Sequence, residues 1–452
     1  MCAEKKEVKM EKILKLIQEG NKVEARNELL KYNVVDIAEF FDTIHGNDLI
    51  ILFRILPKDI AAEVFSYMNP DGQKYIVEIM SDKEIEGMLP NIFMDDIVDF
   101  IEEMPANVVK KVLKNTTPDR RKLINRLLSY PEFSAGSIMT TEFVDLKKEL
   151  TVKQAIERIR HIGFDRETIN TMYVIDDNRR LEGIIEIRKL LLTNESALVS
   201  SLMDVNYVYI KTIDDQEDVA ALFKKYGYLS MPVVDNEHRL VGIITVDDVL
   251  EVIEEENEED FAKMNALAPS DEEYLSSSVV DLAKKRIYWL LFLMISATFT
   301  GIIIRRYEEV LNSVVILASF IPMLMDTGGN AGSQASTLII RGLALGELQL
   351  RDFAKIIWKE FRISLLVGVI LSSINFLRLY FFEKMSLNVS LTVCISMLLI
   401  VILAKVIGGV LPLLAKRLKM DPAIMAGPLI TTVVDTFALV IYFNIASQLV
   451  LS

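Results

Sequence analysis

Five long apolar stretches dominate the last third of the chain. They cover residues 287–304, about 310–345, 357–382, 391–414 and 422–451. A helix needs about 20 mostly apolar residues to cross a bilayer. The pattern therefore predicts five membrane-spanning helices, preceded by a long polar part with shorter apolar periods.

Charged residues flanking these stretches predict their orientation. If the polar part lies inside, the inner flanks carry most of the cations, and the outer flanks carry only Arg305, Arg306, Arg378 and Lys384. Cytoplasmic loops of membrane proteins are enriched in Lys and Arg. Five spans with the N-terminus inside and the C-terminus outside fit this distribution. The start, "MCAEKKEVKMEK", lacks the apolar core of a secretory signal, which also favours a cytosolic polar part.

A polar segment, "PMLMDTGGNAGSQAS", interrupts the second stretch. Unpaired backbone groups and carboxylates are costly in lipid unless they face protein or water. We therefore expect irregular backbone or a helix break in this segment, and we expect it to line a polar cavity. The residues concerned are Asp326, Thr327, Gly328, Gly329 and Asn330.

The fifth stretch, "DPAIMAGPLITTVVD", contains a second polar interruption. It opens with Asp421-Pro422, repeats a break at Gly427-Pro428, and then places Thr431 and Asp435 in an apolar run. An ionisable residue inside a membrane is a functional candidate by default. With no basic residue nearby in its span, Asp435 would find its countercharge in a passing cation. A purely structural role, such as bonding a neighbouring threonine or a backbone amide, is the alternative.

A sequence repeat marks the middle of the chain. Residues 172–191, "MYVIDDNRRLEGIIEIRKLL", and 231–250, "MPVVDNEHRLVGIITVDDVL", are identical at nine of twenty positions. Each copy predicts a strand, a turn and a strand, and the tandem resembles a pair of cystathionine-β-synthase (CBS) domains. That resemblance implies a nucleotide site at Thr245 and Asp248. In the first copy Glu186 and Lys189 depart from the motif, so we expect at most one nucleotide site, and a purely dimerising scaffold is the alternative.

Residues 8–130 show short helical pieces with apolar residues three and four positions apart, typical of an α-helical superhelical domain. After the second repeat an acidic helix is predicted, with one face formed by Glu251, Glu254, Glu255, Glu258 and Glu259. We expect another face of this helix to be traced by Leu250, Ile253, Phe261 and Met264.

Charge divides the chain. Of 50 Lys+Arg and 64 Asp+Glu, residues 281–452 hold 16 and 10, which leaves 34 and 54 for residues 1–280. Such an acidic surface disfavours nucleic acid and concentrates cations. Carboxylates also gather at Asp95, Asp96 and Asp99, and clustered carboxylates suit hard cations such as Mg²⁺. Two cysteines and three histidines are too few for a zinc site.

The order of these parts closely resembles the MgtE family of magnesium channels or transporters, and "DTGGNAGSQ" and "DPAIMAGPLITTVVD" are its specific motifs. The resemblance implies a homodimer in the cytoplasmic membrane, with a Mg²⁺ pore between the second and fifth spans. It also implies closure by cytosolic Mg²⁺, with ATP as a possible modulator. The implied pore carboxylate is Asp435, and the implied regulatory acids are Asp248, Glu251, Glu256, Glu259 and Asp260.

The implied division of the chain has four parts: an acidic helical domain (1–130), a tandem CBS pair (131–248), an acidic connecting helix and linker (249–280) and a transmembrane pore domain (281–452). A CBS-regulated secondary transporter of another divalent cation or of an anion is the alternative. An enzyme is disfavoured, because the sequence shows no nucleophile and base pair and no redox motif.

Overall fold

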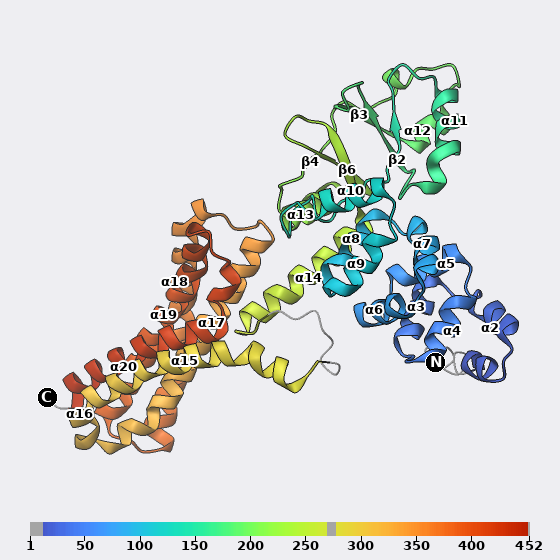
Figure 1. The fold of residues 1–452 in the computed structure, drawn as a ribbon. Coiled ribbons are helices and arrows are strands. Elements are labelled where there is room, and N and C mark those ends of the chain that lie inside the picture. Colours follow the sequence, from blue (N-terminus) through green and yellow to red (C-terminus); the bar gives the residue numbers. More distant parts are fainter. Residues whose placement is uncertain (1–11, 269–276, 451–452) are drawn as a thin grey trace. The chain divides into compact units, whose positions relative to one another are not determined.

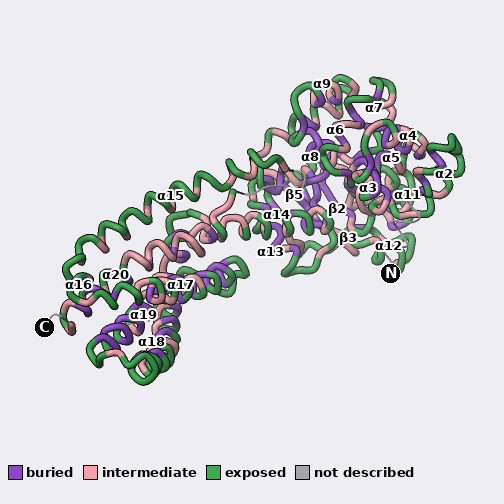
Figure 2. The backbone as a smooth tube through the Cα atoms, turned by 90° about the horizontal axis from the view of Figure 1, so that it is seen from below, coloured by how far each residue is buried: buried purple, intermediate pink, exposed green. Residues whose placement is uncertain are grey.

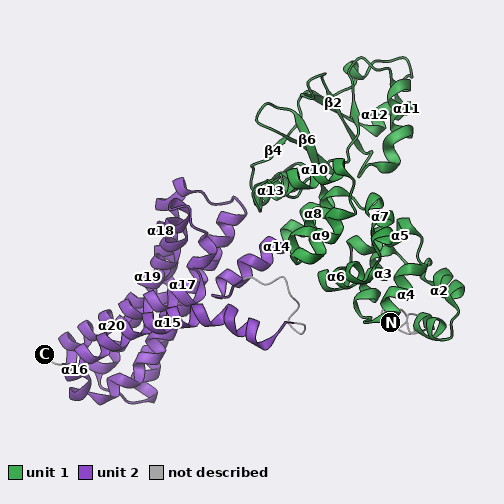
Figure 3. Ribbon diagram, in the orientation of Figure 1, with its two compact units in different colours: residues 1–253 green, residues 254–452 purple. Residues whose placement is uncertain are grey.

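The computed structural model describes residues 12–268 and 277–450 (Figure 1). The chain divides into two compact units, residues 1–253 and 254–452 (Figure 3), and the boundary falls inside one long helix. Each unit is described by itself.

The first unit opens with a series of short amphipathic helices. Polar caps and prolines at helix starts separate them: Asn33 caps α3, Thr117 caps α10, and Pro70 and Pro118 open α6 and α10. The elements are α2 (Lys22–Leu29), α3 (Val34–Asp42), α4 (Asn47–Ile55), α5 (Lys58–Ser66), α6 (Pro70–Ile79), α7 (Asp82–Met88), the 3₁₀ turn η1 (Leu89–Asn91), α8 (Met94–Glu103), α9 (Ala106–Lys114) and α10 (Pro118–Leu127). The predicted helical domain is confirmed.

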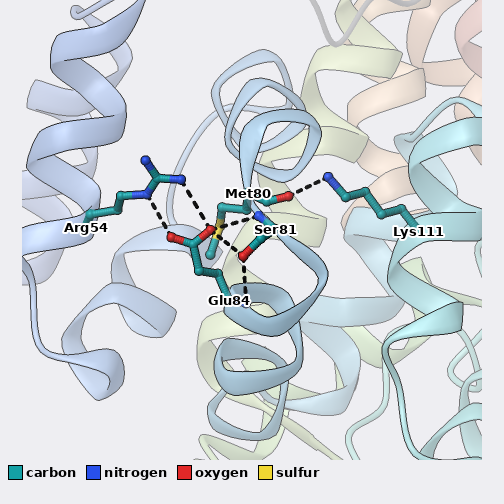
Figure 4. A network of polar contacts seen from close by, with 5 residues as sticks. All are labelled: Arg54, Met80, Ser81, Glu84 and Lys111. Carbon is teal, nitrogen blue, oxygen red and sulfur yellow. Dashed lines mark hydrogen bonds and ion pairs between the residues drawn. The ribbon is translucent and has the colours of Figure 1, made fainter.

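A polar network joins α4, α6, α7 and α9 (Figure 4). The Ser81 hydroxyl accepts the Glu84 amide while the Glu84 carboxylate accepts the Ser81 amide, which forms a capping box. Arg54 Nε donates to Glu84 Oε1 at 2.8 Å, and Lys111 Nζ donates to the Met80 carbonyl at 2.6 Å. Side chains thus provide hydrogen-bond partners for backbone groups at the start of α7 and at the end of α6.

We expect Glu84→Ala to loosen α7, because it removes the capping box and the Arg54 contact together. A cap is worth about 1 kcal/mol, so amide exchange in α7 should accelerate about fivefold when measured by hydrogen exchange on the whole protein. Glu86→Ala, on the exposed side of the same helix, is the control. Unchanged exchange in Glu84→Ala would contradict the assignment.

Two small sheets follow, one for each repeat. In the first, β1 (Asp145–Leu146) runs parallel to β2 (Thr171–Ile175), which pairs antiparallel with β3 (Leu181–Glu186). In the second, β4 (Ile210–Lys211), β5 (Ser230–Val234) and β6 (Leu240–Thr245) repeat this order. The helices are α11 (Val152–Ile162), α12 (Ile187–Leu192) and α13 (Gln216–Tyr226), with 3₁₀ turns η2 (Gly163–Asp165) and η3 (Val199–Ser201). The predicted strand, turn and strand of each repeat are confirmed.

The predicted acidic helix is α14 (Val246–Met264). Its buried apolar positions are Val249 and Val252, whereas Leu250 is 61% exposed and Phe261 is 69% exposed. The apolar face traced by Leu250 and Phe261 is therefore not the buried side of the helix. The true inner face lies one position away from Leu250, because it is set by packing on the first unit, which the helical period alone does not reveal.

The second unit consists of long helices. They are α15 (Val279–Arg306), α16 (Glu308–Ser313), η4 (Val315–Phe320), α17 (Ile321–Ala344), η5 (Leu350–Asp352), α18 (Phe353–Leu377), the π-helical η6 (Arg378–Phe382), α19 (Leu387–Arg417), η7 (Pro422–Met425) and α20 (Gly427–Val450). α19 packs against α17, α18 and α20. No residue of α15 is buried in the structure of the single chain (Figure 2).

Among the described residues, four helices are long and apolar enough to cross a membrane: 279–306, 350–382, 387–417 and 427–450. The second predicted span instead divides into α16, η4 and α17. α17 has 24 residues, but its polar segment lowers its apolar character. It nevertheless packs against two of the apolar helices, α19 and α20.

The expected helix break at 326–330 was wrong, because α17 continues without interruption from Ile321 to Ala344. Its glycines serve close packing instead: a Cβ at Gly328 would lie 2.7 Å from Ile400 of α19 and 3.0 Å from Val434 of α20. Thr327 donates its hydroxyl to the Met323 carbonyl at 2.7 Å, so the helix itself satisfies this polar side chain.

Candidate functional site

The two polar interruptions of the membrane unit lie against each other. α17 and α20 run antiparallel and approach closely at glycines: a Cβ at Gly329 would lie 3.0 Å from Thr431, and one at Gly332 would lie 2.7 Å from Ile430. Continued along both helices, this register brings Asp326 to the level of Asp435, and the charges of the two carboxylates interact. The sequence prediction placed both residues on the ion path.

Exposure separates the candidate pore residues. Asp326 and Asn330 are exposed on α17, and Asp435 and Thr431 are half-buried on α20. Gly328 and Gly329 are buried between helices. The structure shows these two glycines in close packing between helices. Their predicted place on the wall of a pore stays a prediction.

The start of α20 is held from two sides. Asp421 caps η7 by accepting the Ala423 amide at 2.8 Å, and the Ser336 hydroxyl of α17 donates to the Met425 carbonyl at 2.7 Å. Gly427, with φ of 21°, opens α20, and a Cβ there would lie 3.0 Å from the Met264 carbonyl at the end of α14. The break predicted at Gly427-Pro428 is thus the junction of η7 and α20.

Within the second unit, the last turns of α14 contact this junction. Lys263 bridges two carboxylates, with its Nζ 2.7 Å from Glu259 Oε1 and 2.7 Å from Asp421 Oδ2. Burial, followed by the charge of Asp421, raises the pKa of Asp260 to about 6. Sequence reasoning chose Glu259 and Asp260 but missed Lys263, because a lone lysine in an acidic run carries no signal.

A second carboxylate cluster lies in the first unit, where α8 faces the CBS pair and the start of α14. Asp95 is 8% exposed, and its Oδ1 is buried with no hydrogen-bond partner among the described residues. Burial, followed by the charges of Asp248 and Asp96, raises the pKa of Asp95 well above its usual range. Burial also raises the pKa of Asp96, although the Ser66 hydroxyl, 2.8 Å from its carboxylate, opposes the shift.

Two glutamates of the first CBS repeat belong to this cluster and were missed by the sequence prediction. Burial, and then the charges of Asp248 and Asp96, raise the pKa of Glu167 to about 8. Its neighbour across a backbone hydrogen bond is Glu142, whose charge also acts on Asp95. Asp99 remains exposed on α8, yet desolvation and the charges of Asp96 and Asp248 raise its pKa as well.

These carboxylates are close enough to repel, but they do not form a finished metal site. Among the described residues, no group of three or more acidic, histidine or cysteine side chains is arranged to hold a metal ion. The cluster combines buried carboxylates whose pKa values are raised by burial and by one another, and the charge of Arg120 acts on Glu142 at its edge. Such a cluster is stabilised by neutralisation, whether by protons or by a cation.

Thr245 and Asp248, the predicted nucleotide residues, contact each other. The Thr245 hydroxyl and amide both donate to Asp248 Oδ2, at 2.6 and 3.2 Å. Burial raises the pKa of Asp248 to about 6, and the bond from Thr245 lowers it. Asp248 therefore stands between the nucleotide motif and the carboxylate cluster. In the first repeat, Glu186 and Lys189 are exposed.

Long apolar helices, two of which pack together at polar interruptions, are typical of a membrane transport protein. Residues 321–445 match the MgtE family, described as a divalent cation transporter, residues 32–133 match the MgtE intracellular N domain, and residues 135–193 and 199–255 match CBS domains. The chain is 35% identical to the magnesium transporter MgtE of Thermus thermophilus, over 96% of each chain. It is 31% identical to that of Bacillus subtilis, over 92% of this chain and 94% of that protein.

The chain belongs to the MgtE family of magnesium transporters. Two solved structures resemble its first part. The soluble part of a magnesium transporter has a TM-score of 0.53 and 28% identity, and covers 56% of this chain and 99% of its own. The cytosolic domain of the Mg²⁺ channel MgtE in complex with ATP has a TM-score of 0.50 and 33% identity, and covers 53% of this chain and 97% of its own.

Proposed function

We propose that this protein takes up Mg²⁺ across the cytoplasmic membrane as a homodimer, through a pore formed by α17 and α20, with its N-terminal domains in the cytosol. The observation that carries the proposal is the antiparallel pairing of α17 and α20, which brings Asp326 to the level of the intramembrane Asp435. Mg²⁺ influx into proteoliposomes, followed with a fluorescent indicator, tests it. The proposed domains are 1–130, 131–248, 249–280 and 281–452.

Cytosolic Mg²⁺ closes the pore in this proposal. The cluster of buried carboxylates on α8, the first CBS repeat and the start of α14 repels itself when no cation is present. A divalent ion that neutralises it would hold these elements together. At its other end α14 contacts the η7–α20 junction through the ion pair of Lys263 with Asp421, so a change at the cluster can be transmitted along this one helix to the start of α20.

ATP modulates the threshold for closure, because the nucleotide residue Asp248 also belongs to the carboxylate cluster. We expect calorimetry on the whole protein to show one strong ATP site per chain. Asp248→Ala should weaken binding about tenfold or more, since it removes a hydrogen-bonding carboxylate worth roughly 1.5–3 kcal/mol. Lys189→Ala is the matched control in the first repeat. Equal loss from Lys189→Ala would move the site to that repeat.

A further inference from the structure

Two buried charged side chains in the membrane unit have no part in the proposed ion path. Glu360 on α18 and Lys405 on α19 are each 6% exposed. A charged side chain inside a membrane helix is costly unless an opposite charge or a polar group faces it. Glu360 lies about 10 Å along α18, and Lys405 lies about 18 Å before the end of α19. Both are therefore well inside their helices.

The packing of α18 on α19 brings these two residues together. The helices are antiparallel and in contact at several levels: Ser372 donates to the Cys394 carbonyl at 2.9 Å, and a Cβ at Gly368 would lie 2.8 Å from Leu398. A Cβ at Gly409 would lie 3.4 Å from Glu360 Cγ. This register places the Glu360 side chain beside the turn of α19 that runs from Lys405 to Gly409.

Lys405 lies one helical turn before Gly409, on the same side of α19, so it is placed at the level of Glu360 and can offer it a countercharge. Breaking a buried ion pair on one side is strongly destabilising, whereas replacing both partners by neutral groups of similar volume is often neutral. Each residue therefore lowers the free-energy cost of burying the charge of the other.

The same turn of α19 also touches the pore helix. Gly408, next to Gly409, leaves no room for a Cβ against the Gly332 carbonyl of α17. A Cβ at Gly332 would in turn lie 2.7 Å from Ile430 of α20, five residues before Asp435. Gly408 and Gly409 thus let α19 contact α17 on one side and α18 on the other.

We propose that Glu360 and Lys405 form a buried counter-ion pair that fixes α18 on α19 and thereby positions α17 against α20 along the ion path. Both are positioning residues, since neither lies on the faces of α17 and α20 that carry Asp326 and Asp435. The effect on transport rests on the proposed function. The existence of the pair does not, because it is measurable as protein stability.

The test is a double-mutant cycle with Glu360→Gln, Lys405→Met and the double variant, made in the whole protein. Thermal unfolding in detergent should show a lower melting temperature for each single variant and recovery towards the native value in the double variant. Mg²⁺ influx into proteoliposomes should fall at least tenfold in each single variant and recover to within about threefold in the double variant. Lys405→Arg, which keeps the charge, should retain more influx than Lys405→Met.

Ser364→Ala is the control for packing alone, since Ser364 is fully buried one turn from Glu360 and bonds only the Phe361 carbonyl of its own helix. It should keep native influx. Additive losses of melting temperature in the double variant would overturn the pair. Coupled melting temperatures with native influx in both single variants would overturn the positioning role. Absence of Mg²⁺ influx in the unmutated protein would overturn the proposed function, while the melting temperatures would still decide the pair.

Discussion

Asp435→Ala is expected to abolish Mg²⁺ influx into proteoliposomes while the protein remains folded. Asp435 lies eight residues into α20, about 12 Å from the start of the helix, and it is half-buried at the level of Asp326. A fixed negative charge at this depth replaces part of the solvation that a divalent cation loses in the membrane. Removing it costs the ion about 3 kcal/mol or more, which corresponds to roughly a hundredfold loss of influx.

Two further variants show whether charge is the cause. Asp435→Asn keeps the shape and removes the charge, so it should be almost as damaging as Asp435→Ala. Asp326→Asn should give an intermediate loss, because Asp326 is exposed and its charge adds to that of Asp435. Asp352→Asn, at the start of α18 and bound to Lys355, is the control and should keep native influx. Native influx through Asp435→Asn would remove Asp435 from the ion path.

Features set by local pattern could be predicted from the sequence. The helices of the first unit follow from caps and apolar spacing, and the two hairpins follow from repeated β-branched runs, the second of which continues past Gly183 in one repeat and Gly242 in the other. The polar segment of α17 shows where such reasoning stops. Glycines permit both a helix break and close helix packing, and the contacts with Ile400 and Thr431 that decide between them come from other helices.

Residues whose role depends on a distant partner were missed. Glu142 and Glu167 are unremarkable in sequence, and only the fold brings them to Asp95 and Asp248. Lys405 sits alone in an apolar run, and Glu360 directly follows Lys359, so neither suggests a pair until α18 and α19 are placed side by side. A charged residue can be identified in the sequence, but the residue of opposite charge that lies beside it is known only once the fold is known.

The second large effect concerns closure by cytosolic Mg²⁺. Replacing Glu251, Glu255 and Glu259 of α14 together by glutamine has two opposite consequences. Loss of repulsion predicts a pore that is closed at low Mg²⁺, whereas loss of ion bridging predicts a pore that stays open at high Mg²⁺. Exposed like charges one helical turn apart cost only about 0.2–0.5 kcal/mol, and salt screens them further. A divalent ion that bridges carboxylates contacts them directly and carries a double charge, so it interacts with them more strongly than these glutamates interact with one another.

We therefore expect the triple variant to stay conductive where the native protein closes. The loss of Glu259 should act in the same direction, because Glu259 pairs with Lys263, which in turn contacts Asp421 at the η7–α20 junction. Patch-clamp recording with cytosolic Mg²⁺ stepped from near zero to about 10 mM measures the threshold, which reports the coupling between the ion and the pore. The variant with both Glu254→Gln and Glu258→Gln, exposed positions on α14, is the control, and its pore should close at the native threshold.

Closure of the triple variant at the native threshold would show that this acidic face is only solvated surface. The sensor would then lie entirely with the buried carboxylates of α8 and the first CBS repeat, where Asp95→Asn should raise the threshold instead.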